Sequence, residues 1–318
     1  MSEKILERKI INMVENYVKN VPRPFGLFLS GGFDSGLLAA LTRPDSVFRV
    51  KFPYGSKYDE SIYADSIIDH LGLNNVNIIE PTKEDFEINF PKAVKVMGEP
   101  VSHFSLVPLY MLFKKVSESG VGHILSGEGP DEYLGGYARQ IIVDELRKIY
   151  SIPELRNYSN FIDGFIKLDQ SIDQGQLIWR YGEIMGYDPS KVIDYYQLHR
   201  EGKYPLQGII GKMDMELGVV EKMEQKLARH FGVTLHYPYI NDEFAEFCYQ
   251  LPDNLKIRNG VTKWAFKKLS LRYLPETMAD RPKMGGPVFP VNKLMDWMEY
   301  GEFDKTIYIR KQKEILVI

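Results

Sequence analysis

A short loop of small and polar residues has the composition of an anion-binding site. It reads Ser30-Gly31-Gly32-Phe33-Asp34-Ser35, follows the apolar run 25–29 and precedes the apolar helical pattern 37–41. Two adjacent glycines let backbone N–H groups approach an oxyanion, the serine hydroxyls add donors, and the new helix offers its positive end. The loop lacks the lysine of the G-x-x-x-x-G-K-[ST] loop of nucleoside triphosphatases. We expect it to bind phosphate groups in another way.

Asp34 places a carboxylate inside this loop. A carboxylate beside phosphates repels them unless a cation lies between the two, so Asp34 is a candidate Mg²⁺ ligand. The alternative is an aspartate that only stabilises the dipole of the following helix. The context S-G-G-F-D-S after a strand favours the metal ligand.

A second segment, 126–137, combines acidic residues with glycines and reads S-G-E-G-P-D-E-Y-L-G-G-Y. Three acidic side chains fit poorly into a core, and a solvated acidic turn is the alternative. Two carboxylates from adjacent strand ends can hold a metal bound to a polyphosphate. We therefore expect Asp131 to join Asp34 in holding Mg²⁺, and Glu128 to face the reacting region.

The elements that position both motifs follow an alternating pattern. Strands are predicted at 25–29, 46–52, 76–79 and 122–126. Helices are predicted at 3–19, 35–42, 59–71, 83–97 and 105–118. This alternation predicts an α/β fold with a doubly wound, mainly parallel sheet, in which ligands bind at the carboxyl ends of strands. Both motifs fall at such ends.

From about residue 138 the alternation stops, and amphipathic patterns such as 140–149 and 214–231 predict helices. The segment 150–200 is the least readable part of the sequence. No linker composition separates the two parts, so we expect a single domain over 1–318. Its nucleotide-binding half is 1–137 and its mostly helical substrate half is 138–318.

Composition excludes several classes of protein. The chain has 318 residues, 44% of them hydrophobic and 26% charged, with a net charge of −3, which is typical of a globular protein without a nonspecific nucleic-acid surface. A single cysteine, Cys248, excludes an intramolecular disulfide and a cysteine-based metal cluster, and its apolar context predicts a buried helix position. No membrane span or signal-peptide core is predicted, so we expect a cytoplasmic protein.

The two motifs together resemble the asparagine synthetase family, specifically its ATP-pyrophosphatase synthetase domain, which β-lactam and carbapenam synthetases share. The S-G-G-x-D-S loop is similar to the pyrophosphate loop of enzymes that cleave ATP between the α and β phosphates. Further segments resemble family motifs in the same order, namely Y-D-E-S at 58–61, G-E-P at 98–100, G-V-T-L-H-Y-P-Y-I-N at 232–241 and R-P-K at 281–283.

The resemblance implies an ATP-dependent, Mg²⁺-dependent amide ligase. A small carboxylate substrate is adenylated with release of pyrophosphate, and ammonia or an amine then displaces AMP. The implied catalytic residues are Lys283 and Glu128, the metal ligands are Asp34 and Asp131, and adenine is expected near strand 46–52. The implied residues around ATP and its pyrophosphate are Ser30, Gly31, Gly32, Asp34, Ser35, Val50 and Gly127.

The segment 232–241 departs from the family pattern, because Thr234, His236 and Asn241 stand where the family has Glu, Arg and Asp. A histidine is a weaker carboxylate anchor than an arginine. The alternative for His236 is packing beneath Tyr237 and Tyr239. Aspartate is therefore not assigned as the substrate, whereas the ATP site is unaffected.

The residue after Met1 bears on the expected source of nitrogen. Relatives that use glutamine carry a glutaminase whose first residue is cysteine, whereas Ser2 follows Met1 here. We expect the chain not to hydrolyse glutamine and to use ammonia, ammonia from a separate glutaminase, or an amine on its substrate. The last case is an intramolecular cyclase of β-lactam-synthetase type.

Two other functions are less compatible with the sequence. One is a tRNA-modifying ATP pyrophosphatase, which the single cysteine and the acidic net charge disfavour. The other is a scaffold without activity, which the presence of Asp34, Glu128, Asp131 and Lys283 disfavours.

Overall fold

The computed structural model describes residues 3–52, 59–137, 139–141, 174–281 and 305–316. They form two compact units whose segments alternate along the sequence. The sheet unit comprises residues 11–128, 218–238 and 270–318, and the helical unit comprises residues 1–10, 129–217 and 239–269. Helix α1 (Glu3–Val18) contributes residues to both. The predicted division at residue 137 stays a prediction.

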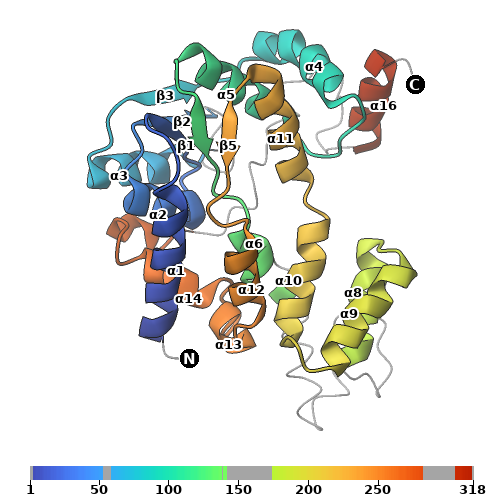
Figure 1. The fold of residues 1–318 in the computed structure, drawn as a ribbon. Coiled ribbons are helices and arrows are strands. Elements are labelled where there is room, and N and C mark those ends of the chain that lie inside the picture. Colours follow the sequence, from blue (N-terminus) through green and yellow to red (C-terminus); the bar gives the residue numbers. More distant parts are fainter. Residues whose placement is uncertain (1–2, 53–58, 138, 142–173, 282–304, 317–318) are drawn as a thin grey trace. The chain divides into compact units, whose positions relative to one another are not determined.

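The sheet unit is built on five parallel strands in the order β3-β2-β1-β4-β5 (Figure 1). Their bounds are β1 Phe25–Phe28, β2 Ser46–Val50, β3 Val76–Ile79, β4 His123–Leu125 and β5 Thr234–His236. The first four confirm the predicted strands. Strand β5 was not predicted, because three residues inside a largely helical region are too few to show a period.

Gly26 of β1 makes the centre of the sheet possible. It pairs with Ser46 on one side and with Ile124 on the other. A Cβ at this position would lie 2.7 Å from a ring carbon of Phe48 and 2.8 Å from Cδ1 of Ile124. Only glycine therefore lets these large side chains meet over β1.

The helices of the sheet unit cover both faces of the sheet. They are α2 Phe33–Thr42, α3 Ser61–Leu71, α4 Lys83–Met97, α5 Leu106–Glu118, α11 Val219–Phe231, η2 Glu276–Met278 and α16 Lys305–Leu316. Right-handed crossovers put α2 and α3 on one face and α4 and α5 on the other. The second face holds a large core in which Phe48, Val94, Phe113 and Leu227 are buried together.

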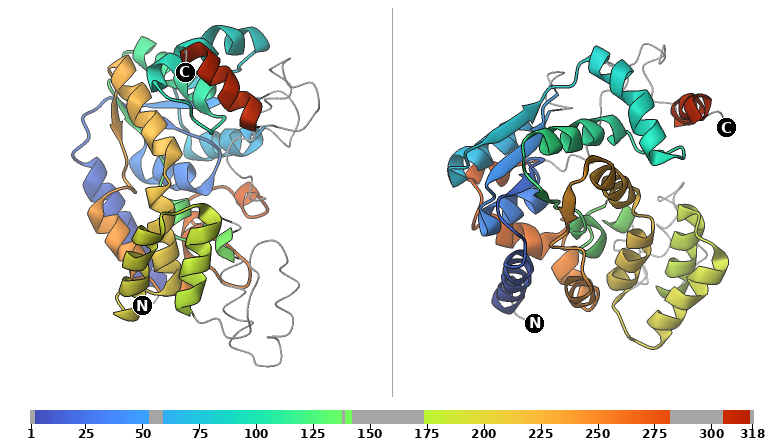
Figure 2. Two further views of the ribbon diagram at one scale, coloured as in Figure 1. Left: turned by 90° about the vertical axis from the view of Figure 1, so that its right-hand side faces the viewer. Right: turned by 45° about the horizontal axis from the view of Figure 1, so that its top comes forward.

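The helical unit confirms that helices dominate the described residues after 138. Its helices are α6 Pro130–Tyr133, α8 Gln174–Met185, α9 Pro189–Arg200, α10 Leu206–Glu216, α12 Asp242–Tyr249, α13 Asp253–Lys256 and α14 Trp264–Ser270. Helices α8, α9 and α10 pack together (Figure 2). Helix α10 lies so close to α6 that a Cβ on Gly211 would be 2.7 Å from the Glu132 carbonyl oxygen.

Two predictions from composition can be compared with this fold. Cys248 is buried on α12, and burial raises the pKa of its thiol. In the part of the chain that the structure describes, no helix has the length and apolar character needed to cross a membrane.

Candidate functional site

The first loop begins where β1 ends, at the point where the strand order changes direction. Strand β1 has β2 on one side and β4 on the other, and all three run parallel. The N–H of Leu29 donates to the Phe48 carbonyl at 3.0 Å and carries the pairing to the last residue before the loop. In open α/β sheets, ligands bind at such a switch point.

Hydrogen bonds within the loop bring its polar groups together. The Ser35 hydroxyl accepts from the Ser30 N–H at 3.2 Å and lies 3.1 Å from the Ser30 hydroxyl, which in turn accepts from the Gly32 N–H at 3.1 Å. Gly31 has a φ of +85°, which favours glycine. Gly32 precedes α2 and has no side chain to cap it. The positive end of α2 therefore faces this turn.

The second motif touches the first through Gly127. A Cβ on Gly127 would lie 3.0 Å from the Ser35 backbone nitrogen and 3.2 Å from its Cα. Glycine at 127 thus lets the chain leaving β4 pass directly over the start of α2. Val50 is the half-buried last residue of β2, so it ends at the same edge of the sheet. The predicted nucleotide-contacting residues of the sheet unit therefore all lie at the carboxyl ends of its strands.

The predicted metal ligands belong to different units. Asp34 is half-buried on the first turn of α2 in the sheet unit, and Asp131 lies on α6 in the helical unit. Their sharing of one Mg²⁺ stays a prediction. Within the described residues, no three His, Cys, Asp or Glu side chains gather to hold a metal on their own. Mg²⁺ on a nucleotide is held by one or two carboxylates plus phosphates, and Asp34 beside the loop suits that mode.

Asp131 has a cationic neighbour within the helical unit. Its Oδ1 lies 2.6 Å from the ammonium of Lys263. Gly136 lies across the same aspartate, and any Cβ there would clash with Asp131 Oδ1. The proposed catalytic Glu128 is half-buried and is the last residue of the sheet unit before the chain enters the helical unit. Lys283 lies outside the described residues, so its role stays a prediction.

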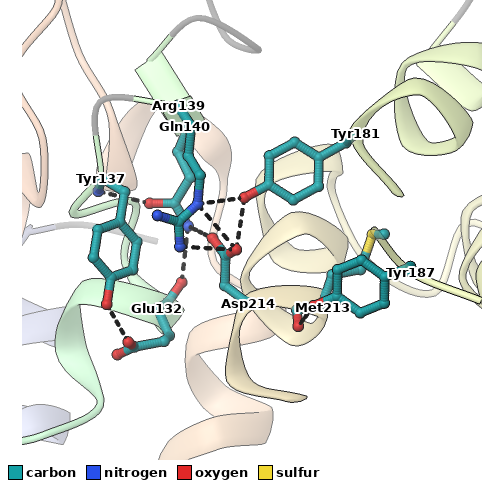
Figure 3. Close-up of polar contacts among 8 residues, drawn as sticks. All are labelled: Glu132, Tyr137, Arg139, Gln140, Tyr181, Tyr187, Met213 and Asp214. Carbon is teal, nitrogen blue, oxygen red and sulfur yellow. Dashed lines mark hydrogen bonds and ion pairs between the residues drawn. The ribbon is translucent and has the colours of Figure 1, made fainter. Parts of the chain in front are cut away.

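A buried network holds the segment that follows Asp131 (Figure 3). The carboxylate of Asp214 on α10 accepts from the Tyr181 hydroxyl at 2.6 Å, from Gln140 Nε2 at 2.7 Å and from Arg139 Nη2 at 3.0 Å. Burial raises the pKa of Asp214, and the neighbouring Arg139 opposes that shift. The network joins α8 and α10 to the residues just after the second motif.

The same network reaches Glu132, next to Asp131. Gln140 Nε2 donates to the Glu132 carbonyl at 3.2 Å, and the Tyr137 hydroxyl donates to the Glu132 carboxyl group (Figure 3). Burial raises the pKa of Glu132 to about 7. Sequence reasoning missed this network, because Asp214 and Tyr181 are far from the motif in sequence and only tertiary packing brings them together.

A second buried carboxyl group lies behind the second motif in the sheet unit. Glu224 of α11 is 3% exposed, and its Oε1 accepts from the Ser126 hydroxyl at 3.2 Å. Burial raises the pKa of Glu224 to about 7. A signal was present in the sequence, since Glu224 shares a helix face with the apolar Leu227 and Ala228, which are also buried.

His236 ends β5 and contacts a second histidine. Its Nε2 lies 3.0 Å from Nδ1 of His123 on β4. Burial lowers the pKa of His236, and the neighbouring His123 lowers it further. Both effects favour a neutral imidazole, which is a poor anchor for a carboxylate.

Comparisons with known proteins point to one family. Residues 18–314 match the model of the family described as asparagine synthase. Asparagine synthetase [glutamine-hydrolyzing] 1 of Bacillus subtilis is 24% identical over 326 residues, which cover 91% of this chain and 51% of that protein. Putative asparagine synthetase [glutamine-hydrolyzing] 2 of Methanocaldococcus jannaschii is 32% identical over 136 residues, covering 40% of this chain and 25% of that protein.

Among solved structures, the NH3-dependent NAD synthetase of Campylobacter jejuni matches with a TM-score of 0.30 and 22% identity. The match covers 62% of this chain and 93% of that one. The chain spans about half the length of the Bacillus subtilis relative, at 51%.

Proposed function

The chain belongs to the asparagine synthase family, and from this membership we propose that it is an ATP-dependent, AMP-forming amide ligase acting on a small carboxylate. The observation that carries the proposal is the contact between the two motifs at the switch point of the parallel sheet. Gly127 lies against Ser35, so the chain that leaves β4 at the start of the second motif runs beside the glycine-rich phosphate loop. Such a pair suits a reaction in which pyrophosphate must leave.

The proposed reaction has two steps. An oxygen of the substrate carboxylate attacks the α-phosphorus of ATP, the bond between the α-phosphorus and its bridging oxygen breaks, and pyrophosphate leaves. An amine or ammonia nitrogen then attacks the acyl carbon of the acyl-adenylate and loses a proton, and AMP leaves with the electron pair of the broken C–O bond. Negative charge builds up on the leaving group in each step.

The chain's own groups match these needs. The N–H and hydroxyl groups of loop 30–35 would stabilise pyrophosphate in the first step. Asp34 and Asp131 would hold Mg²⁺, which neutralises phosphate charge when bound. We assign Lys283 to the α-phosphate and acyl oxygens, where a compact ammonium meets developing charge. Glu128, just beyond β4, is assigned to the reacting region.

We propose that the reaction catalysed by this chain takes its nitrogen from ammonia or an amine. Glutamine hydrolysis by a cysteine-type glutaminase needs a reactive thiol, and the only cysteine in the sequence is Cys248. Its thiol is buried on α12 and its pKa is raised by burial, both of which oppose thiolate chemistry. The names of the relatives include glutamine hydrolysis, so a glutaminase outside these 318 residues is the partner that would supply ammonia from glutamine.

Product analysis tests the proposal. The protein is incubated with ATP, Mg²⁺, an ammonium salt and a panel of carboxylates, and nucleotides are separated by chromatography. AMP and pyrophosphate in equal amounts, dependent on one carboxylate, are expected. ADP and phosphate as the stoichiometric products would refute the proposal. AMP formation that needs no ammonium would instead identify the intramolecular cyclase.

A further inference from the structure

An ion pair lies beside the first loop of the sheet unit. Arg281 Nη2 is 2.7 Å from Glu60 Oε1, and the two side chains are only 7% and 21% exposed. The same Nη2 lies 3.9 Å from the position that a Cβ on Gly32 would occupy. A shielded guanidinium therefore borders the turn to which we assign the phosphates.

The loop and the ion pair share a common support, the start of α3. A Cβ on Gly31 would lie 2.9 Å from the Glu60 carbonyl oxygen and 3.0 Å from the Ala64 nitrogen. The guanidinium also lies over the Tyr63 ring, 5.4 Å from its centroid. Glu60 and Tyr63 thus hold Arg281 at a defined distance from the glycine turn.

The charges at this place are compatible with an anionic ligand. A carboxylate as close to the loop as Glu60 would repel a polyphosphate, and Arg281 cancels that repulsion. Removing a guanidinium from water is costly, and Glu60 compensates one unit of charge. The planar guanidinium has five donors, so it can keep its bond to a carboxylate while offering others to phosphate oxygens.

We propose that Arg281 binds the β and γ phosphates of ATP and that Glu60 is the residue that positions it. This inference rests on the proposed function, because it takes ATP to lie on loop 30–35. It adds a ligand contact from a segment far from the loop in sequence. It also gives the arginine before Pro282 a role separate from the one assigned to Lys283.

Calorimetric titration of the full chain tests the inference with three probes, namely ATP, inorganic pyrophosphate and AMP, each with Mg²⁺. For Arg281→Gln we expect binding of ATP and of pyrophosphate to weaken by roughly 10- to 100-fold, the effect of losing a charged hydrogen bond. AMP lacks the β and γ phosphates, so its affinity should change by less than about twofold. Glu60→Gln keeps the guanidinium and should weaken ATP binding less than Arg281→Gln does.

Arg310 offers a matched control in the same unit. Its Nε is 4.0 Å from Glu314 Oε1, with side chains 67% and 54% exposed, so Arg310→Gln removes an arginine from an exposed pair. It should leave all three affinities unchanged. Arg281→Lys keeps the positive charge but lacks the planar guanidinium, so it should bind ATP with intermediate affinity. This second variant keeps the test valid if Arg281→Gln does not fold.

The outcomes separate this inference from the proposed function. Equal weakening of ATP and AMP binding in Arg281→Gln or Arg281→Lys would assign the arginine a purely structural role and overturn the inference. So would unchanged ATP binding, while the proposed function would stand. If the wild-type chain binds neither ATP nor pyrophosphate, the proposed function fails and the inference fails with it.

Discussion

Lys263 and Asp131 form a 2.6 Å ion pair in which the lysine side chain is 4% exposed and the aspartate side chain 28%. A lysine so well shielded from water needs a carboxylate beside it. Asp131 therefore has a structural partner in addition to the metal-binding role that we propose for it. The acidic motif consequently carries less net negative charge than its sequence indicates.

Replacing Lys263 with methionine should destabilise the protein, because the partly buried Asp131 then loses its cation. Breaking a fully buried ion pair costs about 3 kcal/mol in the free energy of unfolding, and the partial exposure of Asp131 makes this an upper bound here. Urea denaturation measures the effect. Lys268→Met is a matched control, since Lys268 lies 2.6 Å from Glu3 in an exposed pair, whose loss should cost less than about 1 kcal/mol. Equal losses in the two variants would contradict the importance of burial.

Removing the carboxylate of Asp34 should abolish most turnover while leaving the fold intact. We expect Asp34→Asn to form AMP at least about 100-fold more slowly, because a metal on the pyrophosphate contributes several kcal/mol to charge stabilisation. Asp131→Asn should act in the same direction. Asp69→Asn, an exposed position on α3, is the control. AMP formation at a near-normal rate by Asp34→Asn would refute the assignment.

Lys283 should affect the chemistry more than ATP binding. Lys283→Met is expected to lower kcat strongly and to change the KM for ATP little, because the ammonium is assigned to charge that develops during reaction. Lys283→Arg should restore activity only in part, since a planar fork does not replace a compact ammonium. Steady-state kinetics decides, with the exposed Lys92→Met as control. A kcat within about twofold of wild type would assign Lys283 to the surface.

Glu224 should make stability depend on pH in a predictable direction. Burial raises its pKa from 4.5 to about 7, so the folded chain holds a proton that the unfolded chain has already released. The contribution of Glu224 to wild-type stability should therefore fall as pH rises from about 4.5 to about 7 and change no further above that. Glu224→Gln lacks this loss, so its stability relative to wild type should rise through the same window, by up to about 3 kcal/mol.

Urea denaturation of both proteins at pH 4.5, 6 and 8 measures this difference. The pKa of Glu132 is raised in the same direction, but Glu132 is present in both proteins, so its effect on stability cancels in the comparison. Glu87→Gln is the control, because its side chain is 64% exposed and its replacement removes no burial cost. A stability difference between Glu224→Gln and wild type that does not change with pH would show that Glu224 is not protonated in the fold.

The sequence by itself determined the parallel strands β1 to β4 and the two motifs at their carboxyl ends. This was possible because the signals are local. Apolar runs alternate with helical periods, and the glycines of loop 30–35 stand where a tight turn beside a helix start requires them. The family followed from the same residues and their order.

Only the tertiary structure decided which distant residues meet these motifs. Strand β5 joined the sheet because β4 offered an unpaired edge, although its three residues show no strand period. Arg281 meets Glu60, Lys263 meets Asp131, and Asp214 gathers Tyr181, Arg139 and Gln140. A charged residue carries no mark of its partner in the sequence, because pairing depends on which surfaces packing brings together. Burial, which shifts the pKa of Glu224, likewise arises only when the chain is folded.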